Sequence, residues 1–394
     1  MGVWYSLLGT FGGLTVAAWC LSWVRAWWHA RQYVDLPELT TSDREEAVAT
    51  LPSLTVIIPA CNEEGSIEVA AQSLLEQSYP NLQLIFINDR STDATGPIID
   101  RLAQQDDRMT ALHIDTLPAG WLGKVHALSV ATERADGDWL LYTDADVAFE
   151  PNALVEIVHF SETREIDHLA GLPRMKPAGT LIGWAIAAFY TSSMFFVSPK
   201  RVANPDDRIA VGVGALNLVR RCAMEQTPGF EWLKMETIDD MGLGLMVKRA
   251  GGRAMVARAG QQVSLQWYQD VSEMASGLEK NSPGLAKYSV IRSLLLLSIL
   301  PLALLGFACT FFLTWPLVIL AWGLSAACPL LCMSSFAKQT SLPRINFLLF
   351  PLGLTLLWFI FARALFLLWR RGGVQWRGTG YGIAALKKGQ RMEF

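Results

Sequence analysis

The sequence lacks the features that mark several large functional classes. Its six cysteines are scattered, with no Cys-x-x-Cys pair and no Cys/His spacing of the kind that holds zinc, and they suggest no disulfide framework. The formal net charge is only −3, and no long basic run lies in the soluble part, so we expect no nucleic-acid partner. No Gly-x-Gly-x-x-Gly follows the first hydrophobic strand, which disfavours a dehydrogenase. Nothing in the sequence indicates an obligate protein partner.

Charge is also scarce near both ends of the chain. Residues 4–24 carry no charge and residues 293–369 carry few, whereas charged residues crowd positions 35–290. The first run is long enough to cross a bilayer core of roughly 30 Å, and Trp and Arg residues that follow it form an interfacial anchor. A cleaved signal peptide is disfavoured, because no basic region precedes the run and no small-residue cleavage site follows it. We therefore predict an N-terminal transmembrane helix within residues 1–30.

The C-terminal third predicts further membrane helices within residues 291–371. Apolar segments lie at 293–313, 315–334 and 346–369, and prolines in the first two leave a re-entrant hairpin open. The positive-inside rule places both the soluble domain and the basic tail, residues 372–394, in the cytoplasm. Because three full crossings would separate the two, we expect that one C-terminal segment does not cross fully. The expected location is a cell membrane, the inner one in a bacterium.

Residues 50–290 have the pattern of one soluble α/β domain. Hydrophobic periodicity predicts strands that alternate with helices, and Pro59 is expected to end the first strand. The predicted strands cover 55–58, 82–88, 111–114 and 139–147, and the predicted helices cover 67–75 and 95–105. Such βα units build a mostly parallel sheet with helices on both faces. Ligands bind beyond the carboxyl ends of its strands, where the polar clusters of this sequence lie.

Asp144 and Asp146 directly follow the fourth predicted strand and indicate a divalent metal site. Alternate residues of an extended segment face the same way, so both carboxylates can enter one cleft. Mg²⁺ takes only one or two protein carboxylates and completes its coordination with phosphate oxygens and water. A solvated turn is the alternative for an isolated Asp-x-Asp. The position after a strand favours the metal site, with Mg²⁺ or Mn²⁺ as the cofactor.

Two further acidic positions carry functional hypotheses. Asp89 stands at the tip of the second strand, where a carboxylate can accept hydrogen bonds from a base or a ribose. Capping of the next helix is the alternative, and it suits Asp93 better. Asp239 and Asp240 precede a helix, where acidic residues are ordinary partners of the helix dipole. The functional hypothesis makes Asp240 a general base for an acceptor hydroxyl, oriented by Asp239.

Six motifs together resemble the inverting glycosyltransferase family 2. In chain order they are IIPACNEE, NDRSTDAT, GWLGKVHAL, YTDAD, GVGALNLVRR and TIDDMGLGLMVKRAG, and the resemblance covers about residues 50–290. Within this family the chain is similar to the hopene-associated and carotenoid glycosyltransferases and, more distantly, to ceramide glucosyltransferase. The resemblance implies a GT-A-type nucleotide-sugar domain between N-terminal and C-terminal transmembrane helices.

The resemblance also implies roles for single residues. Asp89 would hold the uridine of a UDP-sugar, Lys124 would approach the nucleotide or its phosphates, and Asp240 would be the catalytic base. Asp144 would lie near the ribose and the sugar, while Asp146 would bind the metal that bridges the diphosphate. The other residues implied to line the nucleotide pocket are Pro59, Ala60, Asn62 and Glu64.

The chain departs from part of this family in one respect. Ceramide glucosyltransferase and the processive polysaccharide synthases carry a (Q/R)xxRW motif after the base helix, whereas this chain has QWYQDVSEMASGLEKN there and no Arg-Trp pair. Trp267 is a candidate to stack on a sugar or acceptor. Lys280 is a candidate to supply positive charge near the diphosphate, with a juxtamembrane anchor as the alternative. The missing pair disfavours a processive synthase.

The acceptor is expected to be a membrane lipid. Residues 180–198 are apolar and aromatic, which favours a helix in the membrane interface over a buried core helix. Gly212 and Gly214 would permit close backbone approach under the acceptor. The predicted function is transfer of a sugar from a nucleotide-sugar to a lipid hydroxyl, on a carotenoid, hopanoid or other membrane lipid. A polysaccharide synthase, a polyprenyl-phosphate glycosyltransferase and a non-catalytic scaffold or lipid transporter are the alternatives.

Overall fold

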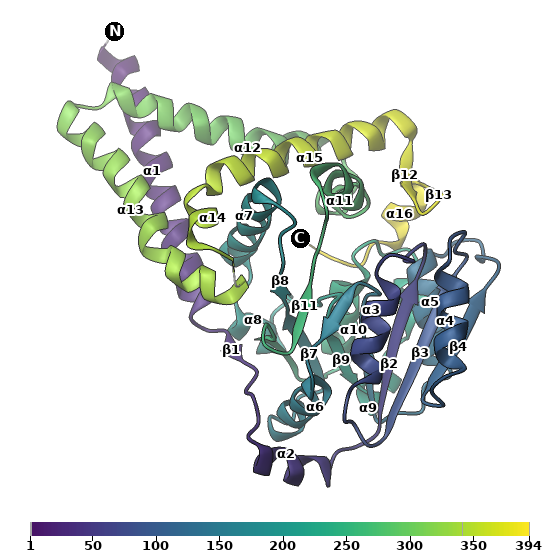
Figure 1. Cartoon of the computed structure of the whole chain (residues 1–394). Coiled ribbons are helices and arrows are strands. Elements are labelled where there is room, and N and C mark those ends of the chain that lie inside the picture. The colour runs from purple at the N-terminus through teal and green to yellow at the C-terminus, as the bar shows by residue number, and fades with distance from the viewer. Residues whose placement is uncertain (1, 341, 394) are drawn as a thin grey trace. The chain divides into compact units, whose positions relative to one another are not determined.

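The computed structural model of the chain describes residues 2–340 and 342–393 and divides into two compact units (Figure 1). The α/β unit comprises Tyr33–Lys176, Pro199–Trp267 and Gln375–Phe394. The helical unit comprises Met1–Gln32, Pro177–Ser198 and Tyr268–Val374. The boundaries of these two units differ from the boundaries of the segments expected from the sequence. Residues 180–198 and 271–290 group with the apolar helices, and the basic tail groups with the sheet.

A mostly parallel sheet forms the core of the α/β unit, which confirms the predicted fold class. Within the described residues this sheet has eight strands. In spatial order they are β1 (Val34–Asp35), β10 (Ala254–Arg258), β7 (His168–Leu172), β9 (Asn217–Arg220), β5 (Trp139–Tyr142), β2 (Leu54–Ala60), β3 (Leu82–Asp89) and β4 (Met109–Ile114). Only β9 runs antiparallel to its neighbours. The central strands β2 and β5 are mostly hydrophobic and almost fully buried, as expected where both faces of a sheet are covered.

The strand order fixes where a ligand can bind. Helices α3 (Ile67–Leu75) and α4 (Thr95–Ala103) connect β2 to β3 and β3 to β4, and α5 (Gly123–Thr132) leads back across the sheet to β5. Because parallel crossovers are right-handed, this reversal puts α5 on the face opposite to α3 and α4. The chain therefore proceeds in one direction across the sheet from β2 and continues on the other side from β5, so the topological switch point lies between these two strands. A crevice at the carboxyl ends of these two strands is the expected binding site.

Two strand ends differ from the sequence-based prediction. Pro59 does not end β2, since it pairs with Ile87 of β3 and the strand continues to Ala60. Its missing N–H faces the side on which β5 has already ended, because the last residue of β2 that pairs with β5 is Ile57. The fourth strand stops at Tyr142, and the acidic residues after it lie in a turn rather than in an extended segment. The alternation argument for Asp144 and Asp146 therefore does not apply.

The other elements of the α/β unit surround this sheet. Three short strands, β6 (Val147–Phe149), β11 (Val263–Leu265) and β8 (Arg174–Met175), form a second sheet. The helices are α2 (Thr41–Val48), α6 (Ala153–Thr163), α8 (Pro199–Ala203), α9 (Arg221–Glu225), η1 (Phe230–Leu233) and α10 (Asp239–Arg249). The tail adds a hairpin of β12 (Gly373–Trp376) and β13 (Thr379–Gly382), followed by α16 (Ile383–Gly389).

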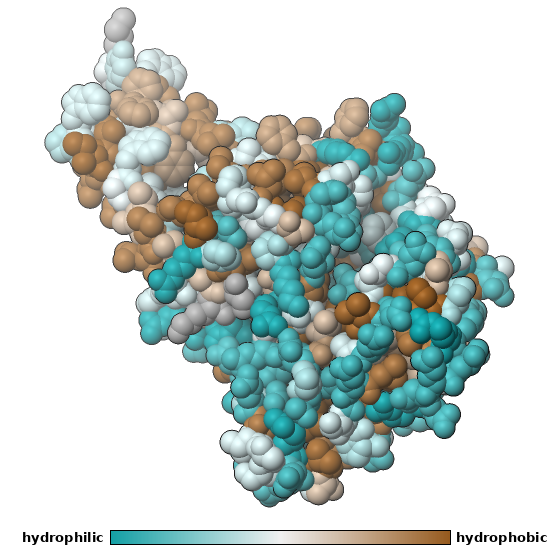
Figure 2. All heavy atoms as spheres, in the orientation of Figure 1, coloured by the Kyte–Doolittle hydropathy of each residue, from teal (hydrophilic) through white to brown (hydrophobic). Residues whose placement is uncertain are grey.

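The helical unit consists of long apolar helices. Its elements are α1 (Gly2–Ala30), α7 (Thr180–Phe196), α11 (Val271–Leu285), α12 (Val290–Cys309), η2 (Thr310–Phe312), α13 (Trp315–Thr340), α14 (Arg344–Leu348) and α15 (Phe350–Arg371). Among the described residues, four stretches are long and apolar enough to cross a membrane: Gly2–Ala30, Val290–Phe312, Trp315–Ala337 and Phe350–Arg371. Large hydrophobic side chains cover their exposed surface, as a lipid environment requires (Figure 2).

Helix α7 covers the stretch for which the sequence favoured a place in the membrane interface. Most of its side chains are buried within the helical unit, where it packs against α1 and α15. Leu181, Phe189 and Phe196 are its exposed large hydrophobic residues. The helix thus has the burial of a core helix, the alternative that the sequence left open, and keeps only a narrow exposed apolar edge.

Candidate functional site

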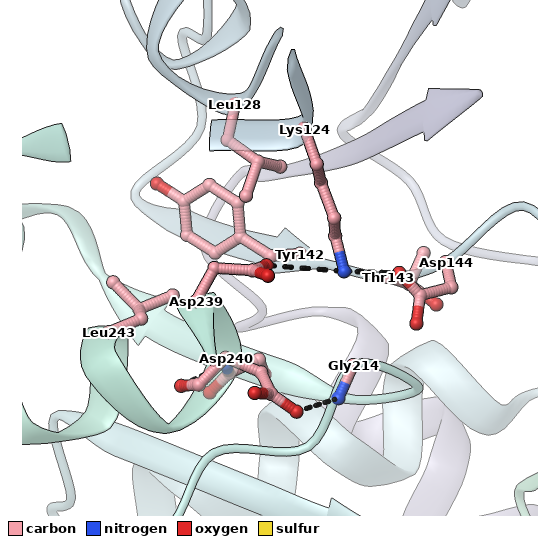
Figure 3. Close-up of a pocket in the computed structure, with 10 residues that line it drawn as sticks. Lys124, Leu128, Tyr142, Thr143, Asp144, Gly214, Asp239, Asp240 and Leu243 are labelled. Carbon is pink, nitrogen blue, oxygen red and sulfur yellow. Dashed lines mark hydrogen bonds and ion pairs between the residues drawn. The ribbon is translucent and has the colours of Figure 1, made fainter. Parts of the chain in front are cut away.

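A pocket lies at the crevice that the strand order predicts (Figure 3). Its walls come from the start of α5, the turn after β5, the loop before β9 and the start of α10. The lining residues are Lys124, Leu128, Tyr142, Thr143, Asp144, Gly214, Asn217, Asp239, Asp240 and Leu243. Five of the residues singled out from the sequence are thus gathered in one place, although the first, Lys124, and the last, Asp240, are 116 positions apart in the chain.

Lys124 is the cation at the centre of this pocket. Its Nζ lies 2.6 Å from Asp144 Oδ1 and 3.2 Å from Asp239 Oδ2, and Figure 3 shows its side chain reaching between the two carboxylates. Burial alone would lower the pKa of Lys124, but the carboxylates of Asp144, Asp239 and Asp240 outweigh it and hold the pKa well above its ordinary value. Lys124 is therefore a fixed positive charge that joins the turn after β5 to the start of α10.

Asp240 is held by backbone groups on both sides. Its Oδ2 accepts a hydrogen bond from the Gly214 N–H at 3.2 Å, and its Oδ1 accepts one from the Met241 N–H at 2.8 Å. Burial and the neighbouring Asp239 raise the pKa of Asp240 to about 6, while Lys124 opposes the shift. A carboxylate with such a pKa is ionised at neutral pH but is a stronger base than an ordinary aspartate.

A buried pair of polar residues fixes the backbone of Asp240. His168 Nε2 lies 2.6 Å from Asn217 Oδ1, and Asn217 Nδ2 donates to the carbonyl oxygen of Asp240 at 3.1 Å. Because the Asn217 amide must donate to that carbonyl, His168 Nε2 carries the proton. Burial lowers the pKa of His168 to about 4, so the ring is neutral. Neither residue was singled out from the sequence, although Asn217 lies within the GVGALN motif.

Gly212 and Gly214 bring two acidic segments together. A Cβ atom on Gly212 would overlap with the carbonyl oxygen of Asp240, and one on Gly214 would overlap with the carboxylate of Asp144. Gly214 also accepts a hydrogen bond from the Asp144 N–H at 2.9 Å. The close approach expected at these glycines is therefore made by Asp144 and Asp240. Contact with an acceptor stays a prediction.

We expect Gly212→Ala to lower activity by about 10²-fold, because the new methyl group must push the Asp240 backbone away from its partners. Crowding of this kind should also cost about 1–3 kcal/mol of stability. Gly260→Ala is the matched control, since a Cβ there would make only ordinary contacts with Arg174. Sugar transfer and thermal unfolding of both variants measure the effect. Wild-type activity in Gly212→Ala would contradict the close packing.

The Asp-x-Asp turn fits a divalent cation. Burial and the carboxylates of Asp144 and Glu63 together raise the pKa of Asp146 to about 7, while Lys124 opposes the shift. A bound cation would reduce the repulsion between these carboxylates. Across the described residues, no three His, Cys, Asp or Glu side chains form a complete cluster for a metal ion. This donor set suits Mg²⁺ or Mn²⁺, which can share its coordination with phosphate oxygens.

Asp89 lies under the rim of the same crevice and is 4% exposed. Its Oδ1 accepts from Arg90 Nε at 2.7 Å and its Oδ2 accepts from Arg90 Nη2 at 3.1 Å. The backbone of Gly123, the residue before Lys124, lies against this ion pair. Asp89 is thus next to the pocket, and its carboxylate is already paired with an arginine.

The loop after β2 is tied to the loop after β3. Asn62 Oδ1 accepts from the Thr92 N–H at 2.8 Å, and Glu64 Oε2 accepts from the Ala94 N–H at 2.9 Å. Asn62 has a left-handed backbone with φ 57°, which turns the chain away from the strand. Both side chains therefore have a structural task. Their contact with a nucleotide, like that of Pro59 and Ala60 at the end of β2, stays a prediction.

A family match covers the centre of the α/β unit. Residues 55–224, which include β2 to β5 and β9, match the model of Glycosyl transferase family 2. This part of the chain belongs to that family. Lys124 and Asp144 of the crevice lie inside the matched segment, whereas Asp239 and Asp240 follow it.

Known proteins that are similar to this chain match it over part of their length. Glycosyltransferase AglD of Haloferax volcanii is 35% identical over 137 residues, which cover 33% of this chain and 21% of AglD. Beta-monoglucosyldiacylglycerol synthase of Nostoc sp. is 27% identical over 207 residues, which cover 51% of this chain and 42% of that protein. The chain therefore spans less than half of these two relatives.

A solved structure shares the fold over most of this chain. The mannosyltransferase PcManGT from Pyrobaculum calidifontis, in complex with GDP-Man and Mn²⁺, has a TM-score of 0.56 and 19% sequence identity. The match covers 89% of this chain and 99% of PcManGT. It supports a GT-A-like fold that extends beyond the segment matched by the family model.

Two predicted site residues lie away from the pocket lining. Trp267 is half-buried and lies two residues after the end of β11 in the α/β unit. Lys280 belongs to the helical unit, where it is buried on α11. The adjacent Glu279 accepts from Arg363 at 2.9 Å and from Arg371 at 2.7 Å, which ties α11 to α15. The roles proposed for Trp267 and Lys280 stay predictions.

Proposed function

We propose that the chain is a membrane-bound, inverting glycosyltransferase that moves a sugar from a nucleotide-sugar, such as a UDP-sugar, to the hydroxyl group of a lipid. The observation that carries the proposal is the placement of Asp240. Its carboxylate opens into the pocket that also holds Lys124 and Asp144, and backbone hydrogen bonds fix its direction. Membership of glycosyl transferase family 2 supports the donor class.

In the proposed reaction Asp240 accepts the proton of the attacking hydroxyl. The oxygen forms a bond to the anomeric carbon as the bond to the nucleoside diphosphate breaks on the opposite face, so the configuration inverts. Asp239 and Lys124 set the charge around Asp240: Asp239 raises its pKa, and Lys124, which is paired with Asp239, lowers it. The His168–Asn217 pair holds the Asp240 backbone, so that the carboxylate meets the hydroxyl with little reorganisation.

Asp146 and Asp144 are the residues that would hold the divalent cation. When bound, Mg²⁺ or Mn²⁺ would neutralise the charge that develops on the leaving diphosphate. The side chain of Asp144 also bonds Lys124, so the same carboxylate would connect the donor end of the pocket to the base. PcManGT was solved with Mn²⁺ and GDP-Man, which agrees with this choice of cofactor and donor class.

A lipid acceptor is supported by two observations. The helical unit offers long apolar helices with exposed hydrophobic surface, and one relative is named for the synthesis of a glycosylated diacylglycerol. A polyprenyl phosphate is the second candidate, and it brings its own anionic nucleophile. The intact base favours a hydroxyl acceptor. The narrower likeness to hopanoid and carotenoid enzymes stays a prediction.

Incubation of membranes that contain the protein with radiolabelled nucleotide-sugars and Mg²⁺ or Mn²⁺ tests the proposal. We expect label in the chloroform-soluble fraction, loss of transfer on chelation, and inverted anomeric configuration in the product. Alkali and mild-acid treatment of the product distinguish a glycoside of a lipid hydroxyl from a glycosyl phosphate. Absence of transfer from every UDP-sugar and GDP-sugar, with lipid extracts of the native membrane as acceptor, would overturn the proposal.

The fold of the tail constrains how the chain crosses the membrane. Trp267 and Gln375 both belong to the α/β unit and therefore lie on one side, so the chain between them must cross an even number of times. Three helices of spanning length lie in that interval. We infer that α15 is the helix that stays at the membrane surface, because it carries Arg363 within its length, bonded to Glu279. This agrees with cytoplasmic placement of both the soluble domain and the tail.

Site-directed labelling tests this membrane arrangement. We expect Cys222, which is exposed in the α/β unit, and a Lys388→Cys variant to react with an impermeant maleimide from the same side of the membrane. Each is introduced as the single cysteine. Gly2→Cys, at the first residue of the first spanning helix, should react from the opposite side and serves as the control. Labelling of Lys388→Cys from the Gly2 side would contradict an even number of crossings.

A further inference from the structure

The tail hairpin presents an arginine at its tip. Strands β12 and β13 are joined by Arg377 and Gly378, whose φ angles of 46° and 76° are both positive, as the favoured two-residue hairpin turn requires. Asn or Asp usually precedes the glycine in such turns, because a longer side chain tolerates the left-handed conformation poorly. The sequence nevertheless places an arginine here. Strained residues of this kind gather at functional sites.

The hairpin packs on the loops that surround the crevice. The Arg377 guanidinium forms an ion pair with Glu63, and its Nη1 lies 3.5 Å from the carbonyl oxygen of Asn62. Thr379 Oγ1 lies 3.4 Å from Nη1 of Arg90, the partner of Asp89. All of these residues, and the hairpin residues from 375 onwards, belong to the α/β unit. The hairpin thus touches the loops after β2 and β3 at once.

A third contact reaches the start of α5. The Tyr381 hydroxyl accepts a hydrogen bond from the backbone N–H of Gly123, the residue before Lys124. Tyr381 is 8% exposed, so β13 is firmly seated there. The charged groups near the hairpin also surround Cys61. Burial raises the pKa of its thiol, Arg377 lowers that pKa, and Asp89 and Glu63 raise it. The tip of the hairpin therefore lies at the donor end of the crevice.

Among the residues that the structure describes, the two cations of the crevice named so far are already paired with carboxylates. Lys124 is shared by Asp144 and Asp239, and Arg90 is paired with the buried Asp89. Arg377 differs from these two, since its side chain is 35% exposed and its partner Glu63 is 25% exposed. An accessible guanidinium can exchange a carboxylate for a phosphate, to which it offers two parallel N–H donors.

We propose that the tail hairpin is part of the donor site and that Arg377 binds a phosphate of the nucleoside diphosphate. This inference rests on the proposed function. In this proposal Arg377 of the tail supplies the positive charge near the diphosphate, a role for which Lys280 was the candidate from the sequence. Glu63 holds Arg377 in position in the free protein and releases it when the donor enters. The hairpin then closes over the diphosphate, with Tyr381 as its anchor on α5.

Binding of UDP, UMP and uridine to the full-length protein in lipid nanodiscs with Mg²⁺ tests the inference. We expect Arg377→Gln to weaken UDP binding about tenfold and to leave uridine binding unchanged, with Arg377→Lys in between. Lys388→Gln is the matched control, because Lys388 is an exposed cation on α16 of the same tail. Equal UDP affinity in Arg377→Gln and the wild type would overturn the inference.

Hydrogen exchange on the wild-type protein gives an independent test that needs no variant. We expect UDP to slow amide exchange in residues 375–382, where uridine has little effect. Unchanged exchange in this segment at saturating UDP would overturn the inference. If the wild type bound neither UDP nor GDP and transferred no sugar, the proposed function itself would fail. If the wild type bound the nucleotide but amide exchange in the hairpin did not change, the proposed function would stand and only the role of Arg377 would be overturned.

Discussion

Replacing Asp240 with asparagine is expected to lower kcat for sugar transfer by about 10²–10⁴-fold and to leave the KM for the donor almost unchanged. The substitution keeps the shape of the side chain and removes its basicity. Asparagine can still accept from Gly214 N–H, so the local fold should persist with the loss of one of two backbone hydrogen bonds. Steady-state rates with donor and acceptor varied in turn measure the effect.

The pH profile of the wild type provides the internal check on this result. Because burial and Asp239 raise the pKa of Asp240 to about 6, the carboxylate becomes protonated as the pH falls through this value. A protonated Asp240 cannot accept the hydroxyl proton, so kcat should fall about tenfold for each pH unit below 6. Lys124 also faces this group and keeps its charge over that range, because the neighbouring carboxylates hold its pKa well above its ordinary value. Asp240→Asn should lack this decline.

Asp115→Asn is the matched control for Asp240→Asn, since Asp115 is an exposed carboxylate of the same unit. It should retain the wild-type rate and the wild-type pH profile. Wild-type kcat in Asp240→Asn would remove Asp240 from the role of base. The polyprenyl-phosphate alternative would then gain weight, because a phosphate acceptor needs no proton removed.

Replacing Asp146 with asparagine is expected to reduce kcat/KM by about 10²-fold or more, since a bound cation contributes several kcal/mol to such a transition state. The effect should differ in kind from that of Asp240→Asn. The donor KM should rise, and the Mg²⁺ or Mn²⁺ concentration for half-maximal rate should rise with it. The measurement is a metal titration at several fixed donor concentrations.

The charge around Asp146 explains this expectation. Asp144 and Glu63 raise its pKa together with burial, so the free protein holds repelling carboxylates that a cation would bring together. Glu150→Gln is a useful control, because Glu150 follows the same turn but pairs with Arg174 at 2.7 Å. An Asp146→Asn variant with unaltered metal dependence would show that the cation binds elsewhere.

Much of the α/β unit follows from local patterns in the sequence. The helix over Ile67–Leu75 and the strand over 82–88 are in the structure nearly as predicted, because a run of hydrophobic residues with period 3.6 or 2 depends only on near neighbours. The apolar segments at both ends were visible for the same reason, since spanning length and lack of charge are properties of composition.

The sequence-based predictions were wrong or incomplete where a feature depends on the neighbouring strands of the sheet. Pro59 continues β2 because β5 has already ended beside it, a fact about a strand 80 residues away. Asp144 and Asp146 lie in a turn, since the ladder between β5 and its neighbours stops at Tyr142. His168 and Asn217 have ordinary strand positions in the sequence, and only their burial beside Asp240 gives them a role.

The sequence by itself determined the order of strands and helices, the acidic residues at strand ends and the apolar segments at the two ends. Tertiary structure decided that Lys124 bridges Asp144 and Asp239, that Asn217 holds Asp240, and that the tail returns to the sheet. The physical reason is the range of the interactions. Periodicity acts over a few residues, whereas ion pairs and hydrogen bonds join residues that only the strand order brings within 3 Å or so of one another.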